Sequence, residues 1–215
     1  VYMKTVKGPL RVDCIYRRLD DSFLDPKVFN KESVIGVPGL FKSWRKGNVG
    51  ILNAVGTGIA DDKVVYSYVN KMIVYYLGEQ PILNQVETFL CHDEIQKNYV
   101  IENISKLVVK PANASGGYGI MIGPKAPKEE REEVIRKIKK NPREFIAQPL
   151  ETLSTAPTIT KNNIEPRHLD LRPFVLSGKS LYVTTGGLTR VALRKGSTIV
   201  NSSQGGGSKD TLIVD

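Results

Sequence analysis

Apolar residues recur at helical spacing over residues 64–77, the most regular stretch of the chain. Apolar side chains three and four positions apart form one stripe along an amphipathic helix. Asp61 or Asp62 is suited to cap its first turn, and Gly78 follows its last residue, where glycine favours termination. The pattern therefore predicts one helix here. The aromatic side chains that we expect in a core are Trp44, Tyr66, Tyr68, Tyr75 and Tyr76.

Shorter elements make up the rest of the first half. Residues 11–17 and 49–52 are mostly apolar and predict buried strands. Residues 20–39 contain Asp-Pro and Val-Pro-Gly and predict a loop. The short helices expected in this region cover residues 40–46 and 92–101.

A strand–loop–strand pattern begins at residue 107. Residues 107–111 and 120–122 are apolar and predict strands, with the small residues of 112–119 as the loop between them. Residues 128–140 carry glutamates early and lysines late, which favours a helix through its dipole. Residues 145–148 predict a further strand.

The last third of the chain is rich in strand signals. Residues 151–167 contain many Thr, Pro and Asn residues and predict a loop, and residues 177–179 predict a hairpin turn. The strands expected in this part are 168–172, 181–184, 188–194 and 198–201. The mixture of hairpins and helices predicts an α+β chain of two lobes, in which residues 92–150 form the smaller lobe.

Composition excludes several classes of protein. A chain of 215 residues can bury a large core, and its apolar runs fall short of the ~20 residues of a membrane span. Cys14 and Cys91 are too few for a disulfide-rich scaffold. His92 and His168 are too few for a histidine-based zinc site. Val1 opens the chain without a signal-peptide pattern, so we expect a cytoplasmic protein and a piece of something longer.

The charge balance favours anionic partners. The chain has 31 basic and 22 acidic residues, a net charge of +9. Its densest basic segment, residues 125–143, also contains glutamates, which is typical of a solvated helix face. We therefore expect no nucleic-acid partner, and a nucleic-acid binder would instead show steeply salt-dependent binding.

Glycine-rich segments at 56–58, 116–119 and 205–207 are candidates for phosphate binding, although none matches a standard fingerprint. In the second of these, Gly116, Gly117 and Gly119 let backbone N–H groups approach phosphate oxygens. Lys110, at the end of the preceding strand, can place a point charge on a phosphate. An ordinary hairpin whose glycines only satisfy turn geometry is the alternative.

Two further segments fit a nucleotide. Lys63 falls in the first turn of the expected helix, where a bound phosphate would offset the unfavourable contact between a cation and the helix dipole. A solvated lysine beside Asp61 and Asp62 is the alternative. Residues 145–150 form an apolar strand running into Pro149, which can pass an adenine ring and offer backbone hydrogen bonds to its edge. A buried strand end is the alternative.

Arginines of the β-rich region can bind phosphoryl or carboxylate oxygens through their planar forks. Asp170 and Arg172 share one face of an expected strand. Arg190 and Arg194 share a face of the next. A surface ladder of salt bridges is the alternative.

Eight ordered motifs span nearly the whole chain. They are IYRRLDDSFLDP (15–26), GVPGL (36–40), NAVGTGIADDK (53–63), VKP (109–111), SGGYG (115–119), RHLDLRPF (167–174), GGLTR (186–190) and NSSQGGGSKDT (201–211). In these motifs the chain resembles the circularly permuted ATP-grasp family, type 2, whose ATP-binding part is similar to that of glutathionylspermidine synthetase, a carbon–nitrogen ligase. The resemblance implies an ATP-grasp fold in permuted order, with two α+β lobes and the nucleotide between them.

The resemblance also implies lobes, cofactors and roles. Residues 1–91 and 151–215 would belong to the larger lobe and 92–150 to the small lobe, with ATP and Mg²⁺ as cofactors. Lys63 and Lys110 would contact phosphates. The loop over the triphosphate would contain Gly116, Gly117 and Gly119, and the adenine hinge Gln148, Pro149 and Leu150. The implied catalytic residues are Arg190, near the transferred phosphoryl group, and Arg172.

Members of that family are longer than this chain. Their upstream part resembles a source of acidic and asparagine ligands for magnesium, so we expect the metal ligands to be missing here, with Asp170 as one candidate. We expect this chain to be inactive alone. In a full-length protein we expect the ATP-binding region of an ATP-dependent carboxylate–amine ligase that works through an acyl phosphate. Its substrates would be small molecules or peptides bearing a carboxylate and an amine. A non-catalytic ATP- or peptide-binding module is the alternative.

Overall fold

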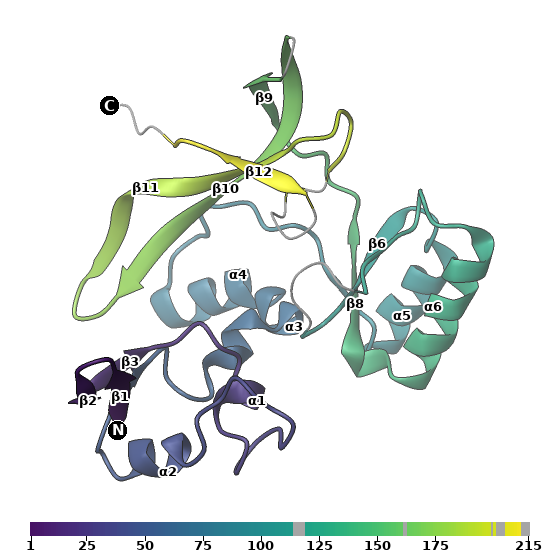
Figure 1. The fold of residues 1–215 in the computed structure, drawn as a ribbon. Coiled ribbons are helices and arrows are strands. Elements are labelled where there is room, and N and C mark those ends of the chain that lie inside the picture. Colours follow the sequence, from purple (N-terminus) through teal and green to yellow (C-terminus); the bar gives the residue numbers. More distant parts are fainter. Residues whose placement is uncertain (114–118, 161–162, 199, 201–204, 212–215) are drawn as a thin grey trace. The chain divides into compact units, whose positions relative to one another are not determined.

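The chain folds into two compact units, Val1–Gln85 and Val86–Asp215. The computed structural model shown in Figure 1 describes all residues except 114–118, 161–162, 199, 201–204 and 212–215. Each unit mixes helices and strands, as expected of an α+β chain. The predicted lobe limits at residues 92 and 150 stay a prediction.

The first unit begins with two small sheets. Strands β1 (Tyr2–Thr5) and β2 (Gly8–Arg11) form an antiparallel hairpin, and β3 (Cys14–Tyr16) runs parallel to β4 (Gly50–Leu52). The strand predicted over 11–17 is confirmed for Cys14–Tyr16, but its expected burial is wrong, because Cys14 and Tyr16 are both exposed. Buried side chains that form the core of this unit are Leu24, Leu40, Val49 and Ile51.

Two short helices contribute to that core. Helix α2 (Leu40–Arg45) confirms the expected helix at 40–46. Helix α1 (Asp21–Leu24) lies inside the segment expected to be loop, and Asp20 caps it by accepting a hydrogen bond from the backbone N–H of Ser22. A single turn of helix carries too little apolar periodicity to be recognised in the sequence.

The helix predicted over 64–77 is confirmed in part: the segment is helical, but a turn at Ser67 and Tyr68 breaks it. It consists of α3 (Lys63–Tyr66), α4 (Val69–Met72) and a π-helical turn η2 (Ile73–Leu77), and the 3₁₀-helix η1 (Thr57–Asp61) precedes it. Its many β-branched and aromatic side chains lose rotamer freedom in a helix. At the break after α3, the Ser67 hydroxyl donates to the carbonyl oxygen of Val64 at 2.7 Å, competing with the helical pattern.

The ends of this segment follow the prediction, but its side chains do not. Asp62 caps α3 by accepting from the backbone N–H of Val64 at 2.8 Å, and Gly78 ends η2 in the left-handed conformation. The four tyrosines expected in a core are exposed, Tyr75 to 81% and Tyr76 to 75%. Local spacing identified the caps, whereas burial depends on packing partners that the spacing does not reveal.

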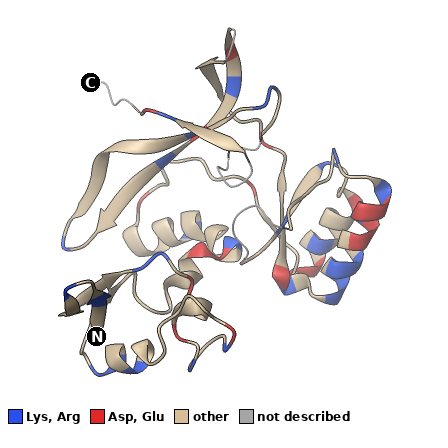
Figure 2. Ribbon diagram, in the orientation of Figure 1, with Lys and Arg blue, Asp and Glu red and all other residues tan. Residues whose placement is uncertain are grey.

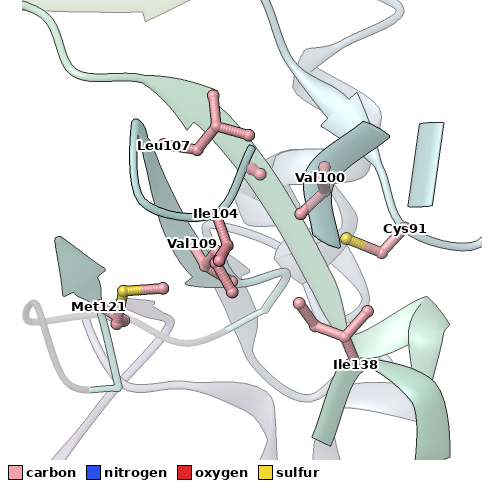
Figure 3. Packing of buried hydrophobic residues seen from close by; sticks show 8 residues of the cluster. Cys91, Val100, Ile104, Leu107, Val109, Met121 and Ile138 are labelled. Atoms are coloured by element: carbon pink, nitrogen blue, oxygen red, sulfur yellow. The ribbon is translucent and has the colours of Figure 1, made fainter. Parts of the chain in front are cut away.

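An antiparallel four-stranded sheet organises the start of the second unit. Its order is β5 (Phe89–Leu90), β8 (Phe145–Pro149), β6 (Leu107–Pro111) and β7 (Met121–Ile122). Helices α5 (Glu94–Glu102) and α6 (Lys128–Lys140) supply Val100 and Ile138 to its core, and η3 (Pro142–Glu144) leads into β8. Figure 3 shows this core. Its buried residues are Cys91, Val100, Ile104, Leu107, Val109, Met121, Ile138 and Ala147.

Helix α6 buries only Ile138 fully. Figure 2 marks basic and acidic residues along much of its length. Glu133 pairs with Lys137 at 2.6 Å, and Lys128 lies 3.8 Å from Glu132. The solvated helix face expected from the charge pattern is confirmed.

A second four-stranded sheet follows, in the order β12 (Gly206–Lys209), β11 (Leu181–Ala192), β10 (Ile164–Ser177) and β9 (Thr155–Ile159). The hairpin turn at 177–179 is confirmed, because Ser177 pairs with Leu181. The loop prediction for 151–167 is wrong over 155–159 and 164–167, where β9 pairs with the start of β10, and is confirmed for 151–154. The residues of β9 show no alternation of apolar and polar positions, and the strand forms because it pairs with β10.

The remaining predictions for this sheet need smaller corrections. The strands expected at 181–184 and 188–194 are one strand, β11, which ends before Arg194. Thr198 and Val200 are not in a strand, and the other positions of the expected strand at 198–201 lie outside the described residues. The glycine-rich tail instead contributes β12, whose Gly206 pairs with Ala192.

Candidate functional site

Lys110 and Gln148 meet on one face of the first sheet of the second unit. In the register of β6 and β8, Lys110 lies opposite Ile146 and Val108 opposite Gln148, so both polar side chains leave the sheet on the same side. Leu107 and Val109 alternate onto the other face and enter the helix-covered core. Lys110 Nζ donates to Gln148 Oε1 at 2.6 Å. Gln148 itself is buried, with 9% of its surface exposed.

Thr88 continues this hydrogen-bonded contact beyond Gln148. Gln148 Nε2 donates to Thr88 Oγ1 at 2.8 Å, and the Thr88 hydroxyl donates to the carbonyl oxygen of Val86 at 3.0 Å. Thr88 immediately precedes β5, which pairs with β8. Sequence reasoning missed Thr88, because 60 positions separate it from Gln148.

The adenine hinge expected at Gln148, Pro149 and Leu150 coincides with the end of β8. Ile146 and Ala147 are fully buried, whereas Leu150 beyond the strand is 41% exposed. The strand therefore runs from a closed core to an open surface at the positions where a planar ring was expected to lie. The role of these residues stays a prediction.

The expected phosphate loop is described only in part. Gly116 and Gly117 lie outside the described residues. Gly119 adopts a φ of +72°, in the left-handed region, and a Cβ there would meet Pro111 Cγ at 3.0 Å. Gly119 is therefore required both by its backbone conformation and by the close approach of β6.

Arg190 lies in the second sheet, where it is held by Asp170. The two residues are direct cross-strand partners on β10 and β11. Arg190 Nε donates to Asp170 Oδ1 at 2.8 Å, and Nη2 donates to Oδ2, so the contact is bidentate. Hydrogen bonding to Asp170 raises the pKa of the Arg190 guanidinium above its ordinary value. Asp170 thus binds a cation of the chain, as in the salt-bridge alternative that the sequence left open for these residues.

Arg172 and His168 share a strand face with Asp170. Arg172 is exposed and lies two positions along β10, opposite Leu188 of β11. The nitrogen Nδ1 of His168 lies 2.8 Å from the carbonyl oxygen of Leu153. The predicted shared face of Asp170 and Arg172 is confirmed, and pairing places Arg190 on that face too. Arg194 lies beyond β11, so its predicted place on that strand is wrong.

Lys63 lies in the first unit, at the first position of α3. This helix has four residues, so the strong helix dipole on which the phosphate argument rested is missing. The carboxylate of Asp62 already caps its N-terminus. The family resemblance remains the basis for Lys63 as a phosphate contact.

Arg17 joins two motifs of the first unit, which sequence reasoning did not foresee. Its side chain is buried and donates to the carbonyl oxygens of Asn53 at 2.6 Å and Ala54 at 2.7 Å. Its Nη2 also lies 2.7 Å from Asp21 Oδ1. Asp21 Oδ2 in turn accepts from the backbone N–H of Gly56 at 3.0 Å. The motifs at 15–26 and 53–63 are therefore held together by hydrogen bonds to Arg17 and Asp21, which also form an ion pair with each other.

Asp25 links the motif at 36–40 to the motif at 15–26 through hydrogen bonds. This carboxylate is fully buried and accepts from the backbone N–H groups of Lys27, Gly39 and Phe41 at 3.0–3.1 Å. Burial alone would raise the pKa of Asp25, but these hydrogen bonds hold it below its ordinary value. Gly36 allows the close approach, since a Cβ there would lie 2.0 Å from the carbonyl oxygen of Phe23.

An apolar cavity of about 380 Å³ lies in the first unit, along the broken helical segment. Val69, Ile73 and Leu77 line one side, and Pro81, Ile82 and Leu83 line the other. Part of the apolar stripe read as core therefore lines this cavity, whereas Val64 of the same stripe is buried. Periodicity identified the stripe but not its environment.

Metal and thiol chemistry find little support in the part of the chain that the structure describes. It holds no group of three His, Cys, Asp or Glu side chains that could bind a metal ion. Burial raises the pKa of the Cys91 thiol to about 11, so it stays protonated within the core, whereas Cys14 is exposed. Among the described residues, no helix combines the length and apolar character required to cross a bilayer.

Comparison with known proteins places these residues in a family. The model of the family described as circularly permuted ATP-grasp type 2 matches residues 1–192. An uncharacterized protein of Synechocystis sp. is 55% identical over 213 residues, which cover 99% of this chain and 44% of the relative. An uncharacterized protein of Mycobacterium tuberculosis is 52% identical over 215 residues, which cover 100% of this chain and 39% of the relative.

A further relative has a name that refers to an activity. A protein of Frankia casuarinae, named provisionally as a glutamate–cysteine ligase, is 48% identical over 203 residues, which cover 94% of this chain and 23% of the relative. The chain thus spans less than half the length of each of these three relatives.

Proposed function

Because the chain belongs to the circularly permuted ATP-grasp type 2 family, we propose that it is the ATP-binding region of an ATP-dependent carboxylate–amine ligase. The name of the Frankia casuarinae relative, a ligase of glutamate and cysteine, supports substrates that bear a carboxylate and an amine. The sheet face that holds Lys110 is the single observation on which the nucleotide site rests.

That face has the chemistry of an anion site beside an apolar surface. Lys110 places a half-buried ammonium at the end of β6, fixed by the amide of Gln148. A lysine ammonium in a partly desolvated position binds phosphate oxygens more strongly than an exposed one. Pro149 and Leu150, where β8 reaches the surface, would contact the adenine, and Gly119 would let the loop backbone approach the phosphates.

Magnesium finds no comparable fit. The described residues contain no group of three metal-ligating side chains, and Asp170, the candidate ligand, is committed to Arg190. We therefore assign no step of the reaction to a metal held by these residues.

The chemistry proposed for the whole protein is amide formation through an acyl phosphate. A substrate carboxylate oxygen would take the terminal phosphoryl group of ATP, and ADP would leave. The amine nitrogen would then attack the acyl carbon, phosphate would depart with the C–O bonding pair, and the nitrogen would lose a proton. Lys110, Arg172 and Arg190 would stabilise the negative charge of the transferred group, which is the largest contribution proteins make to such transfers.

Thermal unfolding of the chain with and without ATP and magnesium tests the nucleotide site. A ligand at 100 times its Kd stabilises a protein by about 2.7 kcal/mol, which shifts the midpoint by several degrees. We expect this shift in the unsubstituted chain, its loss in Lys110→Ala, and its retention in Lys106→Ala, which removes an exposed lysine just before β6.

An equal shift in the Lys110→Ala and Lys106→Ala variants would contradict the assignment, as would no shift at millimolar ATP. Amine-dependent release of ADP, measured in a polypeptide of the relatives' length, distinguishes a ligase from a module that only binds ATP.

A further inference from the structure

Lys110, Gln148 and Thr88 form a hydrogen-bonded chain whose direction is fixed at every link. An ammonium can only donate, so the Gln148 amide must turn its oxygen to Lys110 and its N–H₂ group to Thr88. A carbonyl oxygen can only accept, so the Thr88 hydroxyl must donate to Val86 and accept from Gln148. A flipped amide would place N–H₂ against the ammonium. The backbone of Val86 therefore determines, through two side chains, which atom faces Lys110.

The three side chains come from two adjacent strands and from the residue that precedes a third strand. Lys110 lies on β6, Gln148 on the adjacent β8, and Thr88 immediately before β5, which flanks β8 on its other side. The fully buried Ile146 and the nearly buried Val108 lie beside Gln148 on β8 and β6. A lysine side chain has large rotamer freedom, and a hydrogen bond to a buried, rigidly held amide removes much of it.

The Gln148 amide that accepts from Lys110 is neutral. A glutamate at position 148 would have the same shape and could accept the same hydrogen bond, but it would add a negative charge 2.6 Å from the ammonium. We propose that Gln148 and Thr88 are positioning residues that fix the Lys110 ammonium for a phosphate oxygen, and that position 148 is an amide because a carboxylate would cancel the charge that binds the phosphate. This inference rests on the proposed nucleotide site.

Two measurements on the 215-residue chain test it. The first is the ¹⁵N resonance of the Lys110 ammonium, assigned by its absence in Lys110→Arg, which reports its hydrogen bonding without any ligand. The second is the ratio of the affinities for ATP and adenosine by titration calorimetry. Adenosine lacks the phosphates, so general damage to the fold lowers both affinities and leaves the ratio unchanged.

The expected results separate charge from position. Gln148→Glu keeps the Lys110 resonance but lowers the ratio by about tenfold or more, the fold-change typical of losing one charge-assisted hydrogen bond. Thr88→Val removes the hydroxyl, shifts or broadens the resonance, and lowers the ratio by roughly threefold to tenfold. Thr88→Ser restores both, because it keeps the hydroxyl.

An unchanged ratio in Gln148→Glu would overturn the role of the amide, and an unchanged resonance in Thr88→Val would overturn the positioning chain. If the unsubstituted chain binds no ATP, the proposed function and the phosphate ligand both fail. The resonance in Thr88→Val then still decides whether Thr88 and Gln148 position Lys110. Should Thr88→Val not fold, Thr88→Ala provides the same deletion in a smaller side chain.

Discussion

Two cations of the second unit that are expected to face phosphate are held in opposite ways. Lys110 is held by the neutral amide of Gln148, whereas Arg190 is held by the carboxylate of Asp170 through a bidentate contact. The Lys110 contact therefore fixes a position without adding a charge. The Arg190 contact fixes the plane of the guanidinium group, and the Asp170 carboxylate offsets part of its positive charge.

The difference reflects the geometry of the two cations. An ammonium is a point charge that one acceptor can locate, and its remaining donors can point elsewhere. A guanidinium is a rigid fork, and a paired carboxylate orients the whole group. The two contacts predict different tasks: Lys110 for binding a phosphate by charge, and Arg190 for presenting oriented donors to a transferred group.

The largest effect should come from Arg190→Ala. Removing one preorganised donor to a developing charge lowers the rate by on the order of 100-fold or more. We expect a loss of that size in amine-dependent ADP release, measured in a polypeptide of the relatives' length, with little change in ATP affinity. Undiminished turnover in this variant would show that Arg190 does not stabilise the transferred group, and the proposed difference in task between Lys110 and Arg190 would be wrong.

Asp170→Asn should have a smaller effect, and on stability first. An asparagine offers one acceptor oxygen where Arg190 now contacts two, and the half-buried guanidinium loses its charged partner. We expect a loss of about 1–3 kcal/mol in the free energy of unfolding, measured in urea. Asp13→Asn, which alters an exposed pair with Arg11, is the matched control and should have little effect. Equal losses in both variants would show that Asp170 holds Arg190 no more firmly than a surface pair.

The smallest effect is expected in the pH dependence of stability. It concerns a third kind of contact, in which backbone N–H groups hold the carboxylate of Asp25. Hydrogen bonds from backbone N–H groups hold the pKa of Asp25 below its ordinary value, so the unfolded chain takes up the proton more readily. The stabilisation is complete above the ordinary pKa of an aspartate and is lost as the pH falls through the lowered value.

Comparison with Asp25→Asn isolates this contribution. We expect the unsubstituted chain to exceed the variant in stability at pH 7, and the difference to shrink toward pH 3, as measured by urea unfolding. A difference that stays constant over this range would contradict the assignment to Asp25.

Elements with strong local signals were predicted well. The strand at 107–111 and the helix at 128–140 have the limits expected from their apolar and charged residues, because those patterns match the period of each element. The helix at 64–77 is broken despite its spacing, since β-branched residues and Ser67 interrupt it, and three residues of its apolar stripe line a cavity. Strand β9 was missed because pairing with β10, not its own residues, forms it.

By itself, the sequence determined the family, the α+β character and the identity of the candidate residues, because ordered motifs and local periodicity are written along the chain. Only the tertiary structure decided which partner each candidate meets. Gln148 is 38 positions from Lys110 and 60 from Thr88, and Asp170 is 20 from Arg190. Such contacts depend on strand register, which is set by pairing between distant segments, and a side chain's hydrogen-bond partner follows from that register.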